Sequence, residues 1–281
     1  MTGGNTAGKE RVQLGAVQQT LFGPLAARAR ETRRKRPLLR DPKAAELIAS
    51  IDFDTAKFDF GSASWMMVLR TAIYDFWVRQ FLAGHPAGTV IELGTGLNTR
   101  FDRVDNGQVH WIDLDLPDTI ELRGRFFTDT SRRRMVPASL VSEEWLPAVA
   151  DSPGPYFFVT EGVLAYLPER EVTQTLARIA ARFPGARLAL DTYPRRMMQQ
   201  QHKLAERRGF APWQWPCDDP GSLQRLGLRL DESATVTRPP RAMRRELPPA
   251  YRYLLLPLAD PLMGKMFATL SLFTVTGPAQ P

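Results

Sequence analysis

The sequence predicts an α/β protein built around a mostly parallel β-sheet. Between residues 89 and 191, short continuous apolar runs alternate with stretches of helical periodicity. Continuous apolar runs are typical of strands buried on both faces, as in parallel sheets covered by helices. With 43% hydrophobic and 24% charged residues among 281, the chain has the composition of a globular protein, not of a disordered, collagen-like or coiled-coil one.

Seven strands are expected. The alternating region supplies five of them, at 89–93, 109–113, 134–136, 156–160 and 187–191. Two late strands, near 228–236 and 266–275, are expected to form an antiparallel hairpin at the sheet edge. The sheet is therefore predicted to be seven-stranded and mostly parallel.

The clearest helix is expected over 62–82, because its apolar residues recur at three- and four-residue steps until Gly84 and Pro86 end it. A short helix is expected to begin with Asp41 as N-cap and Pro42 at its first position. Helical spacing over 12–30 is interrupted at Gly23-Pro24. Further helices are expected at 97–105, 116–127, 169–182 and 220–226.

One domain is expected rather than two. Residues 1–10 have the composition of a flexible tail, and residues 11–281 are predicted to fold together. Within that domain, helices over 11–84 are expected to cover the sheet. The segment 195–250 breaks the strand–helix alternation and is expected to form a lid or insert on the substrate side.

The net charge of +7 is concentrated in one stretch. Residues 1–40 carry nine Lys or Arg against two acids, whereas the remaining residues balance at 28 of each sign. Nucleic-acid-binding proteins usually carry a basic stripe with interleaved aromatics on their folded face, so a nucleic-acid partner is not expected. The run 30–36 is either a solvated helix face or a lid whose arginines contact an anionic substrate.

No targeting segment and no membrane partner are expected. The first residues lack an apolar run of signal-peptide length, and no uninterrupted run of about 18 apolar residues occurs. A single cysteine, Cys217, favours the cytoplasm. The histidines at 85, 110 and 202 are too scattered to predict a metal site.

A glycine turn is the most informative motif. Gly94 and Gly96 separate the strand that ends at Leu93 from a helix expected to begin near Leu97. In this strand–turn–helix context, glycines allow a tight turn and a close approach of the backbone to a ligand. A dinucleotide site would have a third glycine where Thr99 stands, so the turn does not demand a pyrophosphate.

Two acids complete the motif. Asp113 and Asp115 follow the next strand, 19 and 21 residues after Gly94. An acid at that distance from a glycine turn is placed to accept hydrogen bonds from ribose hydroxyls. Either acid is a candidate, and Asp113 is alternatively a helix-entry residue. The pattern predicts a nucleoside-containing cofactor at the carboxyl ends of the strands.

Four segments in chain order carry a family resemblance. They are Arg70-Thr71 with Asp75, the run IELGTGLNTR at 91–100, Asp115-Leu116-Pro117, and the run TEGVLAYLP at 160–168. These segments are similar to motifs of the leucine carboxyl methyltransferase family, in its bacterial branch of tetracenomycin-type polyketide O-methyltransferases. The resemblance covers roughly residues 20–195 and implies a class I methyltransferase fold, which is Rossmann-like, with S-adenosyl-L-methionine as cofactor.

The resemblance implies roles for individual residues. Arg70 would pair with the methionine carboxylate of the cofactor, Gly94 and Gly96 would approach its methionine part, and Asp115 would hold its ribose. Glu161 would lie near the amino group or the sulfonium.

The other candidates for cofactor binding are Glu92, Asp113, Ser139 and Leu140. Ser139-Leu140 stands where the family usually has Asp-Leu beside the adenine, and Asn98 stands where its first motif usually has Asp.

Glu161, Tyr166 and Tyr193 are the candidate catalytic residues. Tyr193 and Asp191 end the fifth strand at the expected site face. Structural roles stay open for several residues, because Arg70 is alternatively an exposed charge, Tyr166 a packing residue and Asp191 a helix cap. Three aromatic residues either line a substrate pocket or anchor a loop: Phe210, Trp213 and Trp215.

The expected activity is methyl transfer to a carboxyl or hydroxyl oxygen of a small, polyketide-like secondary metabolite, with S-adenosyl-L-homocysteine as the second product. A carboxylate nucleophile needs no base, and no histidine stands at a predicted strand end. The alternatives are methylation of a protein C-terminal carboxylate, a cyclase or rearrangement enzyme that binds the cofactor without transferring methyl, and a pure binding module. An oligomer is possible.

Overall fold

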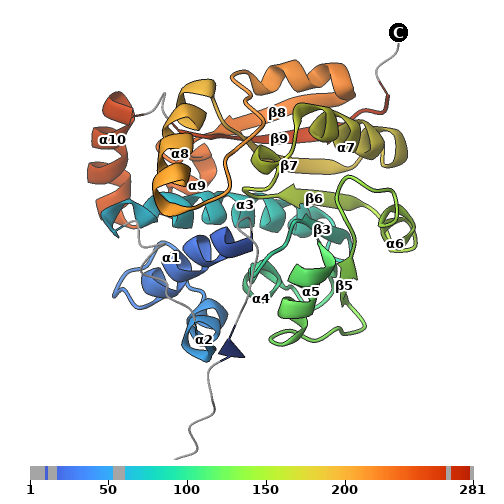
Figure 1. Cartoon of the computed structure of the whole chain (residues 1–281), viewed down its shortest axis with the longest axis horizontal. Coiled ribbons are helices and arrows are strands. Elements are labelled where there is room, and N and C mark those ends of the chain that lie inside the picture. Colours follow the sequence, from blue (N-terminus) through green and yellow to red (C-terminus); the bar gives the residue numbers. More distant parts are fainter. Residues whose placement is uncertain (1–9, 12–17, 53–60, 264–266, 279–281) are drawn as a thin grey trace, which may run out of the picture.

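The computed structural model describes residues 10–11, 18–52, 61–263 and 267–278. Its centre is a seven-stranded sheet with the order β5-β4-β3-β6-β7-β9-β8 (Figure 1). The strands are β3 (Thr89–Leu93), β4 (His110–Asp115), β5 (Arg133–Pro137), β6 (Tyr156–Thr160), β7 (Arg187–Thr192), β8 (Leu228–Ala234) and β9 (Thr269–Val275). Strands β3 to β7 pair in parallel, and β9 is antiparallel to both of its neighbours.

The predicted mostly parallel, seven-stranded sheet is confirmed, and so is the antiparallel pairing of the two late strands at its edge. Strands β3 and β6 have the predicted bounds. Strand β4 runs to Asp115, two residues beyond the predicted end, because Asp113 and Asp115 pair with Met135 and Pro137 of β5. The strand order reverses between β3 and β6, where ligands of open α/β sheets bind.

Helices cover both faces of the sheet. The α-helices are α1 (Phe22–Thr32), α2 (Pro42–Ser50), α3 (Ser64–Gly84), α4 (Arg100–Val104), α5 (Pro117–Gly124), α6 (Leu146–Ala150), α7 (Glu169–Arg182), α8 (Arg195–Arg208), α9 (Arg241–Arg244) and α10 (Leu256–Met263). The 3₁₀ helices are η1 (Gln18–Leu21), η3 (Gly61–Ala63), η4 (Leu164–Tyr166) and η5 (Pro220–Leu226), and η6 (Tyr251–Leu255) is a short π-helix. Figure 1 shows α1, α2, α8 and α10 toward one side of the molecule and α6 and α7 toward the other.

Alternate residues of the central strands enter two apolar cores. Val90 and Phe157 face a cluster centred on α3, whereas Ile91 and Phe158 face a cluster with α6 and α7. Strand β3 is buried along its whole length, as its continuous apolar run predicts. Burial on both faces fixes the strand ends, and with them the turns that follow β3, β4 and β6.

Two details of the predicted helices are wrong. Gly23-Pro24 does not interrupt the first helix but lies in the opening turn of α1, where proline is tolerated because the first N–H groups of a helix have no intrahelical acceptor. The helix after the glycine turn begins at Arg100 rather than near Leu97. The capped start of α2 is confirmed, since the Asp41 carboxylate accepts from the backbone N–H of Ala44 at 2.9 Å.

Residues 1–9 of the predicted tail lie outside the described residues. Glu10–Arg11 forms β1, which pairs in parallel with β2 (Ile51–Asp52). The division into a single domain, a cover over 11–84 and an insert over 195–250 stays a prediction. None of the helices within the described ranges is both long and apolar enough to cross a membrane.

Candidate active site

The turn after β3 has a backbone that only glycine adopts easily. Gly94 and Gly96 have φ angles of +70° and +49°. A Cβ atom would lie 2.4 Å from a methyl group of Val163 at Gly94, and 2.5 Å from one of Leu21 at Gly96. The N–H groups of Gly94 and Thr95 donate to the carbonyl oxygen of Leu114 at 2.8 and 3.0 Å, which ties the turn to β4.

Asp115 faces this turn from the end of β4. One carboxylate oxygen accepts from the Gly96 N–H at 2.7 Å, and the other accepts from the Leu116 N–H at 2.8 Å. Burial raises the pKa of Asp115, and the two N–H donors partly oppose this shift. Each oxygen keeps a further lone pair, so the carboxylate can also accept from two hydroxyl groups.

Asp113 lies beneath the turn, fully buried. Its oxygens accept from the Thr95 hydroxyl at 2.8 Å and the Trp111 indole N–H at 3.1 Å, and they pair with Arg123 at 3.0 Å and Arg133 at 2.8 Å. Burial opposes the charge of Asp113, but the two arginines outweigh it and lower the pKa. The contacts of Asp113 are therefore structural, and Asp115 is the acid with oxygens left to bind a ligand.

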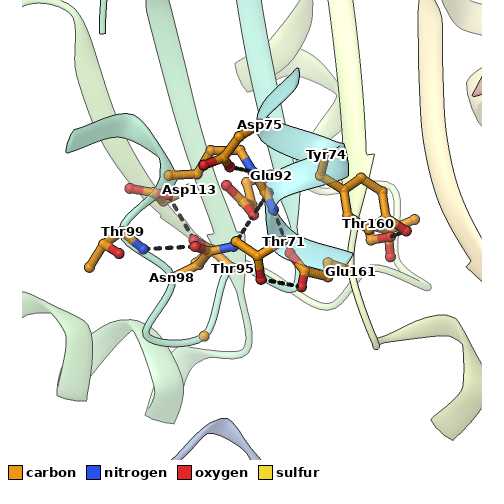
Figure 2. A network of polar contacts seen from close by, with 12 residues as sticks. Thr71, Tyr74, Asp75, Glu92, Thr95, Asn98, Thr99, Asp113, Thr160 and Glu161 are labelled. Atoms are coloured by element: carbon orange, nitrogen blue, oxygen red, sulfur yellow. Dashed lines mark hydrogen bonds and ion pairs between the residues drawn. The ribbon is translucent and has the colours of Figure 1, made fainter. Parts of the chain in front are cut away.

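A buried ionic network lies beside the turn and joins α3, α4, β3 and the end of β6 (Figure 2). At its centre, the fully buried guanidinium of Arg100 bonds to Asp75 at 2.9 Å and also to Glu92 and Glu161. Glu92 also accepts from the Asn98 amide at 2.7 Å. The predicted residues Glu92 and Glu161 thus meet through an arginine, which fixes the position of both carboxylates.

Glu161 is held in its ionised form within the network. Besides Arg100, it accepts from the Arg70 Nε at 3.0 Å and the Thr71 hydroxyl at 2.8 Å. Burial opposes its charge, but the nearby arginines, Arg70 foremost, outweigh this and lower the pKa to about 2. A carboxylate held in this way is a weak base at neutral pH.

Acid is expected to remove the stability that Glu161 contributes. Its folded-state pKa is about 2 against an ordinary value of 4.5. The contribution, on the order of 3 kcal/mol, is therefore complete above about pH 5 and is lost as the pH falls toward 2. The free energy of urea unfolding of the wild type and Glu161→Gln should converge as the pH is lowered from 7 to 3. A difference that is the same at every pH would contradict this assignment.

Arg70 also binds a second pair of predicted residues. Its Nη1 donates to the Tyr193 hydroxyl at 3.0 Å, and that hydroxyl donates to Asp191 at 2.8 Å. Burial raises the pKa of Tyr193, and the charge of Asp191 raises it further. Asp191 also accepts from the Gly162 N–H at 2.9 Å, so it joins the site rather than capping a helix, and α8 has Pro194 at its N-cap.

The remaining candidates lie at the margin of this cluster. Tyr166 is half-buried in η4, and its hydroxyl has no hydrogen bond within the part of the chain that the structure describes. Ser139 is half-buried and follows Ala138, whose N–H donates to the Asp115 carbonyl at 2.9 Å. Leu140 is buried in the core that faces α6 and α7. The roles of these three residues stay predictions.

The three aromatic residues of the loop after α8 lie in different surroundings. Trp215 is buried in the core and anchors the loop. Trp213 is half-buried, and its ring centroid lies 4.1 Å from that of Tyr193. The rings of Trp213 and Tyr193 form a small apolar cluster with Met197, Ala165 and Ala268. Because the Tyr193 hydroxyl accepts from Arg70, this cluster adjoins the ionic network. Phe210 packs instead against the core formed by α1 and α2.

The sequence analysis named Arg70 but missed the other buried arginines around the site. Arg100 lies inside the run that carries the glycine turn, yet nothing in the run predicts its three carboxylate partners. Arg28 and Arg103 pair with Asp41 and are also buried, so the charge seen in the N-terminal stretch is partly internal. No group of three or more metal-ligating side chains occurs among the residues described.

The donor set fits S-adenosyl-L-methionine. Asp115 offers two oxygens with free lone pairs where ribose hydroxyls are expected, and the glycine turn lies directly beside it. Arg70 keeps its Nη2 without a hydrogen-bond partner in the described ranges, so it can still pair with a carboxylate. The three groups are thus chemically matched to a nucleoside that carries an amino-acid chain.

Comparison with known proteins identifies the family. Residues 22–180 match the family "Leucine carboxyl methyltransferase". The chain is 34% identical to the tetracenomycin polyketide synthesis O-methyltransferase TcmP of Streptomyces glaucescens, over 82% of this chain and 87% of that protein. It is 27% identical to the S-adenosyl-L-methionine-dependent methyltransferase dpfgK of Gibberella zeae, over 64% of this chain and 66% of that protein.

The fold has a solved counterpart. A crystal structure of a Thermobifida fusca protein assigned as a methyltransferase superposes with a TM-score of 0.61 at 17% identity, over 88% of this chain and 97% of that one. At this identity the likeness concerns the fold, which is that of the class I methyltransferases. The family match and the sequence likeness to TcmP show that the chain belongs to the leucine carboxyl methyltransferase family of S-adenosyl-L-methionine-dependent methyltransferases.

Proposed function

We propose that this enzyme methylates a carboxylate or acidic phenolate oxygen of a small, polyketide-like acceptor. The observation that carries the proposal is that neither of the predicted catalytic residues Glu161 and Tyr193 is placed to act as a base. Glu161 has a pKa of about 2, and the Tyr193 hydroxyl is already donated to Asp191. An acceptor oxygen that arrives ionised needs no base, so this site suits it. The likeness to TcmP supports a small acceptor over a protein.

The residues divide into binding and positioning groups. Asp115 would accept the ribose hydroxyls, the turn at Gly94 and Gly96 would pass beside the methionine part, and the free Nη2 of Arg70 would pair with its carboxylate. Glu161 would face the sulfonium or the amino group. Arg100 holds Glu161 ionised and in place, which keeps a negative charge where the cofactor is positive.

The cofactor supplies an activated methyl group on a positively charged sulfur. Bound at this site, it would supply the methyl carbon to the acceptor oxygen, and the electron pair of the broken carbon–sulfur bond would remain on sulfur in the neutral thioether S-adenosyl-L-homocysteine. No proton has to move when the acceptor is a carboxylate. The task left to the protein is to hold the oxygen in line with the methyl group, and such positioning supplies a large part of the acceleration in reactions of this type.

The acceptor is proposed to lie against the apolar cluster of Trp213, Tyr193 and Met197. The half-buried indole of Trp213 offers an aromatic face next to the end of β7, where the site residues converge. Replacing Trp213 with alanine is expected to raise the acceptor KM about two- to tenfold, as an aromatic contact is worth roughly 0.5–1.5 kcal/mol. The affinity for S-adenosyl-L-methionine should stay within about threefold of the wild type. A fall in cofactor affinity with unchanged acceptor KM would place the acceptor elsewhere.

The direct test is turnover with an acceptor that carries both oxygen types. With 3-hydroxy-2-naphthoic acid, mass spectrometry distinguishes the methyl ester from the methyl ether, and S-adenosyl-L-homocysteine release gives the rate. Ester or ether formation supports the proposal. Methylation of a short peptide at its C-terminal carboxylate, with none of the naphthoate, would favour a protein acceptor instead. Cofactor that is bound but never consumed, across a library of such acids and phenols, would overturn the methyl-transfer proposal.

We also propose that the enzyme acts in the cytoplasm, which the single cysteine favours.

A further inference from the structure

We propose that Arg123 is a positioning residue of the cofactor site. Its hydrogen bonds to the glycine turn hold the backbone there in the conformation that binds S-adenosyl-L-methionine. The inference rests on the cofactor placement proposed above. Arg123 belongs to α5, eight residues after Asp115, and its side chain is only 1% exposed.

The contacts of Arg123 converge on the turn. Its Nη1 donates to the carbonyl oxygens of Gly96 and Asn98, both at 2.8 Å, and its Nη2 pairs with Asp113 at 3.0 Å. The guanidinium carbon lies 4.2 Å from the centroid of the Phe127 ring. A planar group held on one face by an aromatic ring and by three oxygen partners has a fixed orientation.

Gly96 is held on both sides of its α-carbon. Its carbonyl oxygen accepts from Arg123 at 2.8 Å and its N–H donates to Asp115 at 2.7 Å, so the two peptide planes that meet at Gly96 are both fixed. A glycine-containing turn is costly to order, because glycine loses more backbone freedom than any other residue when its conformation is fixed. If Arg123 did not order the turn before the cofactor binds, part of that cost would reduce the free energy of cofactor binding.

Stability alone does not explain an arginine at this position. Its Nε has no hydrogen-bond partner among the described residues, and burying a charge is costly even when it is paired. Arg123 also favours the ionised form of Asp115, which must accept the ribose hydroxyls. Both contributions act on cofactor affinity and neither acts on the acceptor.

Arg133 is a matched control within the same cluster. It is 5% exposed, pairs with the same Asp113 at 2.8 Å, and lies against the same Phe127 ring at 4.7 Å. Unlike Arg123, it makes no hydrogen bond to the turn in the structure as described. Substitution at either position breaks an ion pair with Asp113, but only substitution at Arg123 releases the Gly96 and Asn98 carbonyls.

The test is calorimetric titration of the full chain with S-adenosyl-L-homocysteine. We expect Arg123→Met to raise the Kd at least tenfold and Arg123→Lys, which keeps a donor, to stay within about threefold of the wild type. Arg133→Met should lower the melting temperature but leave the Kd within about threefold. In turnover, Arg123→Met should raise the KM for S-adenosyl-L-methionine while kcat at saturation stays within about threefold.

Equal affinity in Arg123→Met and the wild type, or equal weakening in Arg133→Met, would overturn the inference. Should Arg123→Met fail to fold, Arg123→Gln, which is too short to reach both carbonyls, gives the same comparison. A wrong role for Arg123 can be told apart from a wrong placement of the cofactor. If the cofactor were bound elsewhere, Asp115→Ala would bind S-adenosyl-L-homocysteine as tightly as the wild type.

Discussion

Replacing Asp115 with alanine is expected to weaken the binding of S-adenosyl-L-methionine by at least two orders of magnitude. The carboxylate already holds the Gly96 and Leu116 N–H groups at 2.7 and 2.8 Å, so its two oxygens are fixed in orientation before any ligand arrives. Hydrogen bonds to a charged group contribute about 1.5–3 kcal/mol each, and two of them would be lost together with the order of the turn. Calorimetry on the purified variant measures the change directly.

Asp118 provides the control for this substitution. It lies three residues further along, in the first turn of α5, and is exposed. Asp118→Ala removes the same charge from the same region without removing a partner of the turn, and its Kd should remain within about threefold of the wild type. If both alanine variants bound the cofactor as the wild type does, the ribose would have to be held elsewhere.

Replacing Arg100 with methionine is expected to cause the largest loss of stability. The substitution leaves the carboxylates of Asp75, Glu92 and Glu161 buried without their shared cation. Removing one partner of a buried ion pair typically costs about 3–5 kcal/mol, which in a chain of this size lowers the melting temperature by roughly 10 °C. Thermal unfolding followed by circular dichroism tests this. Lowering the pH should reduce the difference in melting temperature between the variant and the wild type, because the unpaired carboxylates become protonated.

Arg132 is the comparison for this second prediction. Its ion pair with Asp105 at 2.6 Å is shorter than many pairs in the protein, yet the two side chains are 31% and 26% exposed. Partly exposed pairs contribute about 1 kcal/mol or less, so Arg132→Met should shift the melting temperature by only a few degrees. Similar losses in the two variants would mean that burial does not set the strength of the network around Arg100.

The parts of the site that depend on local sequence were predictable. A strand, two glycines and an acid at the end of the next strand lie within 27 consecutive residues, and each follows from backbone rules for turns and parallel strands. The choice between Asp113 and Asp115 was left open by spacing alone. The structure distinguishes the two acids by their contacts, since Asp113 is enclosed by Arg123 and Arg133 while Asp115 binds the N–H of Gly96 in the turn.

The parts that depend on distant contacts were not predictable. Arg100 binds acids 25, 8 and 61 residues away along the chain, and no periodicity encodes such a set. Helix α8 was also missed, because only Met198 and Ala205 of its fourteen residues are buried and its apolar stripe is too thin to predict a helix. The roles of Ser139, Leu140, Tyr166 and the other candidate site residues remain predictions until variants are measured.

The position of β9 has a consequence for biosynthesis. This last strand of the sheet lies between β7 and β8, and β8 pairs with no other strand of the sheet. During translation, before residues 269–275 have emerged from the ribosome, one edge of β7 is therefore unpaired and β8 has no partner strand. Open edges of this kind recruit other chains. Chaperones should therefore be needed to hold the nascent chain until residues 269–275 have emerged from the ribosome, and truncation before Thr269 should yield aggregates rather than a smaller, active protein.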